Sequence, residues 1–158
     1  MKKSFFIFFR IFIVSIILVL QGLSESAEQG TSLKTVKVKS QKDETITYPV
    51  SDFKNGKAKF YSFKSNDGVV IKYFILKSSD GVIRAAFDAC DVCFKWKEGY
   101  FQQGNLMVCK RCGQKFLSAK INEVKGGCNP APLNRRIEGN KVIINKSDIL
   151  DGEFYFSQ

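Results

Sequence analysis

The sequence predicts a mainly β protein: a single small domain of antiparallel strands with a cysteine-rich, loop-dominated metal-binding segment. Short runs of aromatic and β-branched residues alternate with turn residues, and no run keeps a helical period beyond about two turns. All five cysteines lie between positions 88 and 134. With 158 residues, 44% of them hydrophobic, the chain is long enough to bury a core without covalent staples.

Residues 1–26 have the layout of a secretory signal. Lys2 and Lys3 precede a long apolar run, and small and polar residues follow it. A cleaved signal and an uncleaved anchor both fit, because residues 5–23 are apolar enough for membrane anchoring and are interrupted only by Arg10. We therefore expect the rest of the chain to lie on the periplasmic side of the inner membrane, either secreted or N-terminally anchored.

A polar, lysine-rich stretch at residues 27–47 is typical of a flexible tether, so the folded β-rich domain is expected to span residues 48–158. Three runs then predict a meander of antiparallel strands, at residues 58–63, 69–76 and 82–87. Both separators end in Asp-Gly, which strongly favours a tight hairpin turn.

Two further runs near the C-terminus repeat the strand pattern. They are KVIIN at Lys141–Asn145 and EFYF at Glu153–Phe156. We expect strands at both positions, with Ile149 and Leu150 between them.

The formal net charge is +10, and histidine is absent. Without histidine the chain lacks the commonest neutral metal ligand and the usual general base, so any metal must rely mainly on thiolates. No specific nucleic-acid partner is expected, since scattered lysines on a β-rich surface are usually solvated. These features favour a non-enzymatic electron-transfer or metal-binding protein over a hydrolase.

The cysteines follow the pattern C-x₂-C-x₁₅-C-x₂-C-x₁₅-C, at Cys90, Cys93, Cys109, Cys112 and Cys128. The first four have the spacing of a four-thiolate site, because two thiols on one tight turn can face the same ion and a second turn completes a tetrahedron. Cys128 is surplus to a closed zinc site. Three interpretations stay open: Cys128 is the fourth ligand of a cluster that one thiol of the C-x₂-C pairs does not reach, a thiol beside the ligands, or a buried thiol in a turn.

Spacing alone does not separate zinc, a single iron and an iron–sulfur cluster, because each accepts four thiolates. Disulfides are a rival interpretation, although pairing would leave one of five thiols over. A thiol–disulfide oxidoreductase using CDVC or CKRC is a further alternative, but neither motif opens a recognisable helix. A structural zinc module that shapes a surface for a protein partner also remains open.

Four segments, SSDGVIRAAFDACDVC, KEGYFQQGNLMVCKRCG, INEVKGGCNPAPL and IINKSDIL, resemble the FtrD-like membrane iron–sulfur family of prokaryotic domains. The resemblance spans about residues 58–150, and all five cysteines fall on the family's cysteine positions. It implies a membrane-associated protein that carries an iron–sulfur cluster or another metal. It also implies an inner-membrane iron-transport or redox protein as partner, with electrons or iron passing between the two.

Overall fold

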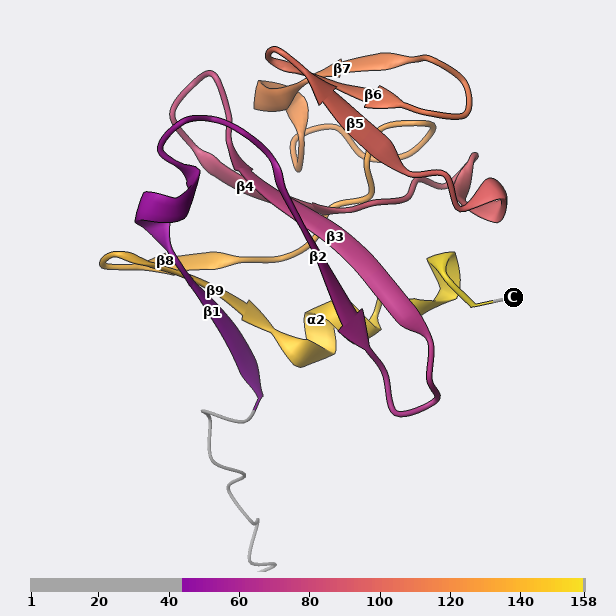
Figure 1. The fold of residues 1–158 in the computed structure, drawn as a ribbon, viewed down its shortest axis with the longest axis horizontal. Coiled ribbons are helices and arrows are strands. Elements are labelled where there is room, and N and C mark those ends of the chain that lie inside the picture. The colour runs from indigo at the N-terminus through magenta and orange to yellow at the C-terminus, as the bar shows by residue number, and fades with distance from the viewer. Residues whose placement is uncertain (1–43, 158) are drawn as a thin grey trace, which may run out of the picture. The chain divides into compact units, whose positions relative to one another are not determined.

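The computed structural model describes residues 44–157, which form three antiparallel sheets of three strands each (Figure 1). The predicted mainly β, single small domain of antiparallel strands is confirmed. The expected signal or anchor at residues 1–26, and all but the last four residues of the expected tether, lie outside the described residues.

The central sheet is the predicted meander of β2 (Lys59–Lys64), β3 (Val70–Lys77) and β4 (Ile83–Phe87). Both Asp-Gly turns are present, and Gly68 and Gly81 each have a φ of 86°. A positive φ favours glycine because a Cβ would crowd the backbone there. The two Asp-Gly turns therefore join the paired strands where the sequence predicts them.

Residues 73–76 of β3 are buried on both faces of the central sheet, which explains why this part of the strand is aromatic or aliphatic throughout instead of alternating with polar residues. Tyr73 and Ile75 belong to a first hydrophobic core, while Phe74 and Leu76 belong to a second one on the opposite face. Figure 1 shows β2–β4 in the middle of the fold, with the other two sheets on either side of it.

The sheet on the first core has the order β1-β9-β8, with β1 at Thr45–Pro49, β8 at Arg136–Glu138 and β9 at Lys141–Asn145. The expected strand at Lys141–Asn145 is thus confirmed. Strand β1 begins inside the stretch assigned to the tether, because Ile46 and Tyr48 pack against the first core. A short 3₁₀-helix, Val50–Phe53, follows β1 and buries its last residue.

The prediction of a strand at Glu153–Phe156 is wrong. After helix α2 (Lys146–Leu150), the chain forms a 3₁₀-helix at Glu153–Tyr155. Gly152 packs so closely on Phe87 that a Cβ would collide with the aromatic ring. The three consecutive aromatic residues of this segment face different ways, since Tyr155 is buried in the first core while Phe154 is exposed.

The third sheet lies within the cysteine-rich segment and was not predicted. It consists of β5 (Tyr100–Gln103), β6 (Leu106–Cys109) and β7 (Lys115–Leu117), and two further 3₁₀-helices flank it at Phe94–Trp96 and Ser118–Lys120. Its buried face covers the second core. Five of the buried members of that core come from β5 and β6 or from the first cysteine turn, so buried thiols are part of the hydrophobic interior.

Candidate metal centre

The first cysteine pair lies in the loop that follows β4. Cys90 and Cys93 are both buried, and the Cys93 backbone N–H donates to the Cys90 sulfur over 3.2 Å. The loop is closed at its base by Asp88, whose Oδ1 accepts the Tyr100 N–H at 2.7 Å. This hydrogen bond joins the end of β4 to the start of β5, and it holds the first pair beside the third sheet.

The second pair lies at the turn between β6 and β7. Cys109 ends β6 and is buried opposite Tyr100 in the strand register, whereas Cys112 is exposed. Gly113 has a φ of 73° and donates its N–H to the Cys109 carbonyl at 2.9 Å. An L side chain rarely adopts this conformation, so glycine at this position allows the chain to turn closely after Cys112.

Cys128 reaches the first pair because the residues after it run along the free edge of β4. The Phe87 N–H donates to the Ala131 carbonyl at 2.8 Å, and the Ala131 N–H donates to the Ala89 carbonyl at 2.9 Å. The Tyr100 hydroxyl donates to the Cys128 carbonyl at 2.6 Å. These contacts bring the Cys128 sulfur to 3.6 Å from that of Cys93.

The five sulfurs fall into two groups, in each of which all sulfurs lie within 4.8 Å of one another. One group is Cys90, Cys93 and Cys128, and the other is Cys93, Cys109 and Cys112. Two thiolates on one tetrahedral ion, with bonds of about 2.3 Å, lie about 3.8 Å apart. Each group is therefore compact enough to offer three ligands to one ion, and thiolates are the donors that zinc and iron–sulfur sites use.

Burial and neighbouring thiols set the ionisation of the metal-free centre. Burial raises the pKa of Cys128 to about 11, and burial together with the Cys128 thiol raises the pKa of Cys93 well above its usual range. The backbone N–H of Gln114 stabilises the Cys112 thiolate and lowers its pKa. Because the thiolate is the metal ligand, the buried thiols must lose protons when a metal binds.

Two arginines close in sequence to the cysteines also contact other side chains. Arg84 is almost fully buried, and its guanidinium contacts Asp80 at 2.7 Å and Glu123 at 2.6 Å. Arg111 lies over the ring of Trp96, with 4.6 Å between the guanidinium carbon and the ring centre. Arg84 is therefore committed to two carboxylates, whereas Arg111 lines a pocket together with Cys90, Cys93 and Cys109.

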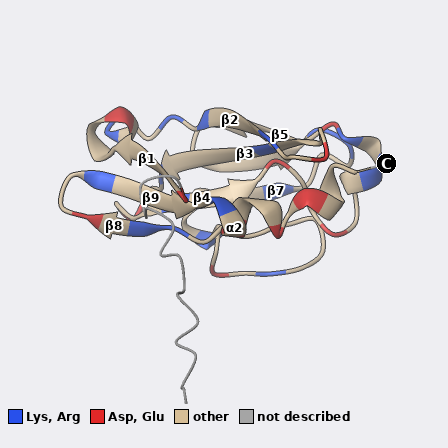
Figure 2. Ribbon diagram, turned by 90° about the horizontal axis from the view of Figure 1, so that it is seen from below, with Lys and Arg blue, Asp and Glu red and all other residues tan. Residues whose placement is uncertain are grey.

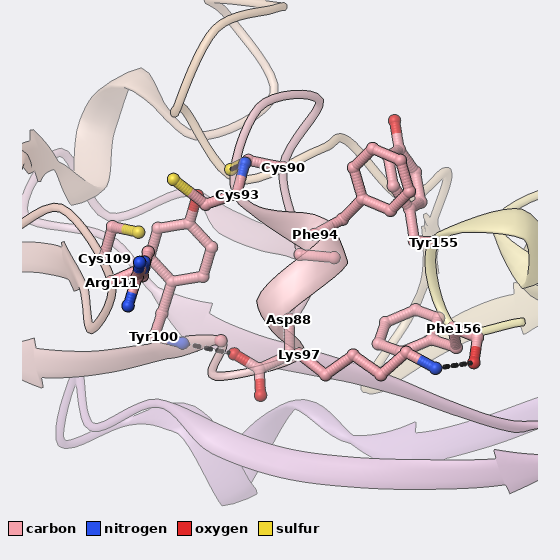
Figure 3. A pocket seen from close by; sticks show the side chains of 12 residues that line it. Asp88, Cys90, Cys93, Phe94, Lys97, Tyr100, Cys109, Arg111, Tyr155 and Phe156 are labelled. Atoms are coloured by element: carbon pink, nitrogen blue, oxygen red, sulfur yellow. Dashed lines mark hydrogen bonds between the residues drawn. The ribbon is translucent and has the colours of Figure 1, made fainter. Parts of the chain in front are cut away.

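A narrow pocket beside the centre has a volume of about 10 Å³, which is roughly the space of one water. Figure 3 shows Cys90, Cys93 and Cys109 along one side of it, and Phe94, Tyr155 and Phe156 along the other. The C-terminal aromatic residues thus limit the access of water to the buried thiols.

The C-terminal segment is fastened to the first cysteine turn at two points. The Tyr155 hydroxyl lies 2.6 Å from an Asp91 carboxylate oxygen, to which it donates. Lys97 donates from Nζ to the Phe156 carbonyl at 3.2 Å, as drawn in Figure 3. The aromatic cover is consequently tied to the turn that carries Cys90 and Cys93.

Sequence reasoning did not assign the polar groups that order this centre. Neither Asp88 nor Asn129 received a role. Asn129 is buried beside Cys128 and donates from Nδ2 to the Val124 carbonyl, while its Oδ1 has no hydrogen-bond partner among the described residues. The available signals were the position of Asp88 two residues before CDVC and the Asn-Pro step after Cys128.

The fold and the site define a small antiparallel β protein whose convergent thiols could hold metal. A family model described as "Membrane iron-sulfur containing protein FtrD-like" matches residues 53–156, and the chain therefore belongs to this FtrD-like family. No curated protein and no solved structure matches the chain. Within residues 44–157, none of the helices has the length and apolar character needed to cross a membrane.

Proposed function

We propose that this protein is an exported, membrane-associated iron–sulfur protein that passes electrons or iron to or from an inner-membrane partner. The observation that carries the proposal is the convergence of five cysteine sulfurs from three separate loops of a chain without histidine. The family description, which names a membrane iron–sulfur protein, supports the same choice of metal.

In this proposal Cys90, Cys93, Cys109, Cys112 and Cys128 are the residues that hold the iron. A bound iron–sulfur group supplies one-electron chemistry at a potential that depends on its charge, hydrogen bonding and exposure to solvent. The chain contributes backbone N–H donors to sulfur, a hydrophobic surround from the second core, and an aromatic cover. Exposed Cys112 marks the side from which a partner would reach the centre.

The remaining cysteine alternatives receive less support from the described residues. Neither CxxC motif opens an α-helix, because the first leads into a 3₁₀-helix and the second into β7. A helix N-terminus is one of the devices that lower a thiol pKa in disulfide oxidoreductases. We therefore favour metal binding over thiol–disulfide exchange for both motifs.

The metal content of the full chain, produced and purified without oxygen, tests the proposal. We expect iron together with acid-labile sulfide, absorption in the visible range, and an electron-spin resonance signal in one oxidation state. Cys109→Ser should lose most of the iron. Met107→Leu is the matched control, since it changes a buried residue of the same strand while conserving volume. A colourless wild-type protein without iron would overturn the assignment.

Export needs a separate measurement. Alkaline phosphatase fused after residue 158 should be active in cells, because this reporter folds only where its disulfides can form. Deletion of residues 1–26 should abolish that activity without lowering the amount of fusion protein. Equal activity with and without these residues would contradict export by this segment.

A structural zinc module is the second candidate, and the N–H to sulfur bond at Cys90 and the Gly113 turn are the observations that favour it. Such a site is normally closed by four thiolates and adds directly to folding stability. Zinc in place of iron in the anaerobically prepared, colourless protein would support it.

A further inference from the structure

We propose that the five thiols form a centre for two metal ions, in which the Cys93 thiolate bridges the ions. The inference rests on the proposed function only in requiring that the cysteines bind metal. It adds the number of ions and assigns a distinct role to one of the five cysteines.

The division of the sulfurs carries this inference. The inner group contains Cys90 and Cys128, the outer group contains Cys109 and Cys112, and Cys93 belongs to both. Among the described residues, these are the two groups of three or more metal-ligating side chains whose ligand atoms all lie within 4.8 Å of one another. A single tetrahedral ion requires four sulfurs that are all about 3.8 Å apart, whereas each group in the part of the chain that the structure describes contains three.

The balance of charge also favours two ions. One divalent ion with four thiolates has a net charge of −2, whereas two divalent ions with five thiolates have a net charge of −1. A buried charge is costly unless it is paired. Arg84 is already paired with two carboxylates, and the less negative centre requires less compensation from nearby cations. It also gives the fifth thiol a ligand role.

The two halves of the centre differ in their exposure. Cys90 is 1% exposed and the Tyr100 hydroxyl clamps the backbone at Cys128, whereas Cys112 is exposed to solvent. An ion in the outer group therefore has the easier route to solvent. We expect it to be removed by a chelator first, while the inner ion is retained for longer.

Cadmium titration of the reduced, metal-free full chain tests the inference without any need for iron. After removal of loosely bound metal, the wild-type protein should retain two cadmium ions per chain. Thiolate-to-cadmium absorption should rise until the second ion is bound. In a sample with cadmium-113, the two resonances should show scalar coupling, because they share a thiolate. Saturation at one ion, or two resonances without coupling, would overturn the proposal.

Three variants locate the bridge. Cys93→Ser should lose the coupling and hold no more than one ion, because it removes a ligand from both groups. Cys112→Ser should retain the inner ion, and Cys128→Ser should retain the outer one. If Cys93→Ser still binds two coupled ions, Cys93 is not the bridge. The coupling is measured in the wild-type protein, so the proposal can be refuted even if a variant fails to fold.

The outcomes also separate this inference from the proposed function. Two coupled cadmium ions in a protein that contains no iron after anaerobic production would support the bridged centre and reject the iron–sulfur assignment. An iron-containing protein whose cadmium form binds a single ion would support the iron–sulfur assignment and reject the bridged centre.

Discussion

The hydroxyl of Tyr100 offers the sharpest test of how the fold holds Cys128 in place. It is the only hydrogen-bond donor to the Cys128 carbonyl among the described residues, at 2.6 Å. Tyr100→Phe removes this donor but keeps the ring, which is 2% exposed and packs near Phe74 in the second core. The change therefore removes this hydrogen bond and the contact of the same hydroxyl with the Cys90 thiol, with little effect on packing.

The expected cost follows from the carbonyl left without a partner. A buried acceptor that loses its only donor costs about 1–3 kcal/mol, and partial access to solvent places Tyr100→Phe in the lower half of that range. If the same energy holds the Cys128 sulfur beside Cys93, affinity for the metal falls by about tenfold, since each 1.4 kcal/mol is a factor of ten.

Urea unfolding of the reduced, metal-free protein measures the first quantity. The midpoint should fall while the dependence of the free energy of unfolding on urea stays the same, because the exposed surface does not change. Competition with a coloured chelator measures the loss of metal affinity. Tyr61→Phe is the matched control, since Tyr61 is partly buried and its hydroxyl makes no hydrogen bond among the described residues.

The control should change the free energy of unfolding by less than about 0.5 kcal/mol. The reasoning is refuted if Tyr100→Phe is no more destabilising than Tyr61→Phe. It is refuted in part if stability falls but metal affinity does not, because the hydrogen bond would then support the core without positioning Cys128.

Three other predictions concern the supports of the centre. Gly99→Ala should lower the free energy of unfolding in urea by more than about 2 kcal/mol, because φ is 70° and a Cβ would collide with the Asp88 carboxylate. Gly104→Ala is the control and should lower it by only about 1 kcal/mol, since φ is 58° but no atom lies near the added Cβ. Equal losses for the two variants would contradict this prediction. Hydrogen bonds from a serine hydroxyl and from Arg84 hold the pKa of Asp80 at about 2, below its ordinary 3.8, so the stabilisation is present above pH 4 and disappears as pH falls towards 2. Asp80→Asn should lose less stability across that window, as measured by thermal unfolding at each pH. Metal-loaded protein should unfold at a higher urea concentration than the reduced metal-free form, since a ligand that binds only the folded state stabilises it; equal midpoints would argue against a site built by folding.

The meander could be predicted because its signals are local. Asp67-Gly68 and Asp80-Gly81 each place a glycine where the turn requires a positive φ, and the aromatic and β-branched runs between them are long enough to be recognised. Such signals need no knowledge of distant contacts. The same reasoning failed at Glu153–Phe156, where a contact between Gly152 and the distant Phe87 decided the conformation.

The third sheet escaped prediction for a related reason. Its three strands have three or four residues each, which is too short for a period of two to stand out from a glycine-rich background. The sheet is stabilised by packing on the second core rather than by strong local propensity. The third sheet forms because β3 has apolar side chains on both of its faces, and one of these faces contributes to the second core. The sequence of β5–β7 alone does not reveal this contact.

The arrangement of the five thiols depends on the same long-range pairing. Even spacing suggests two equivalent pairs and one extra cysteine, but the structure places Cys128 with the first pair. It does so because the chain after Cys128 hydrogen-bonds along the free edge of β4, from Ala131 to Leu133, immediately before the loop that carries Cys90 and Cys93. Cys93 then faces Cys128 on one side and the end of β6 on the other. The pairing at the edge of β4, more than the C-x₂-C spacing, therefore makes Cys93 the sulfur that the two groups share.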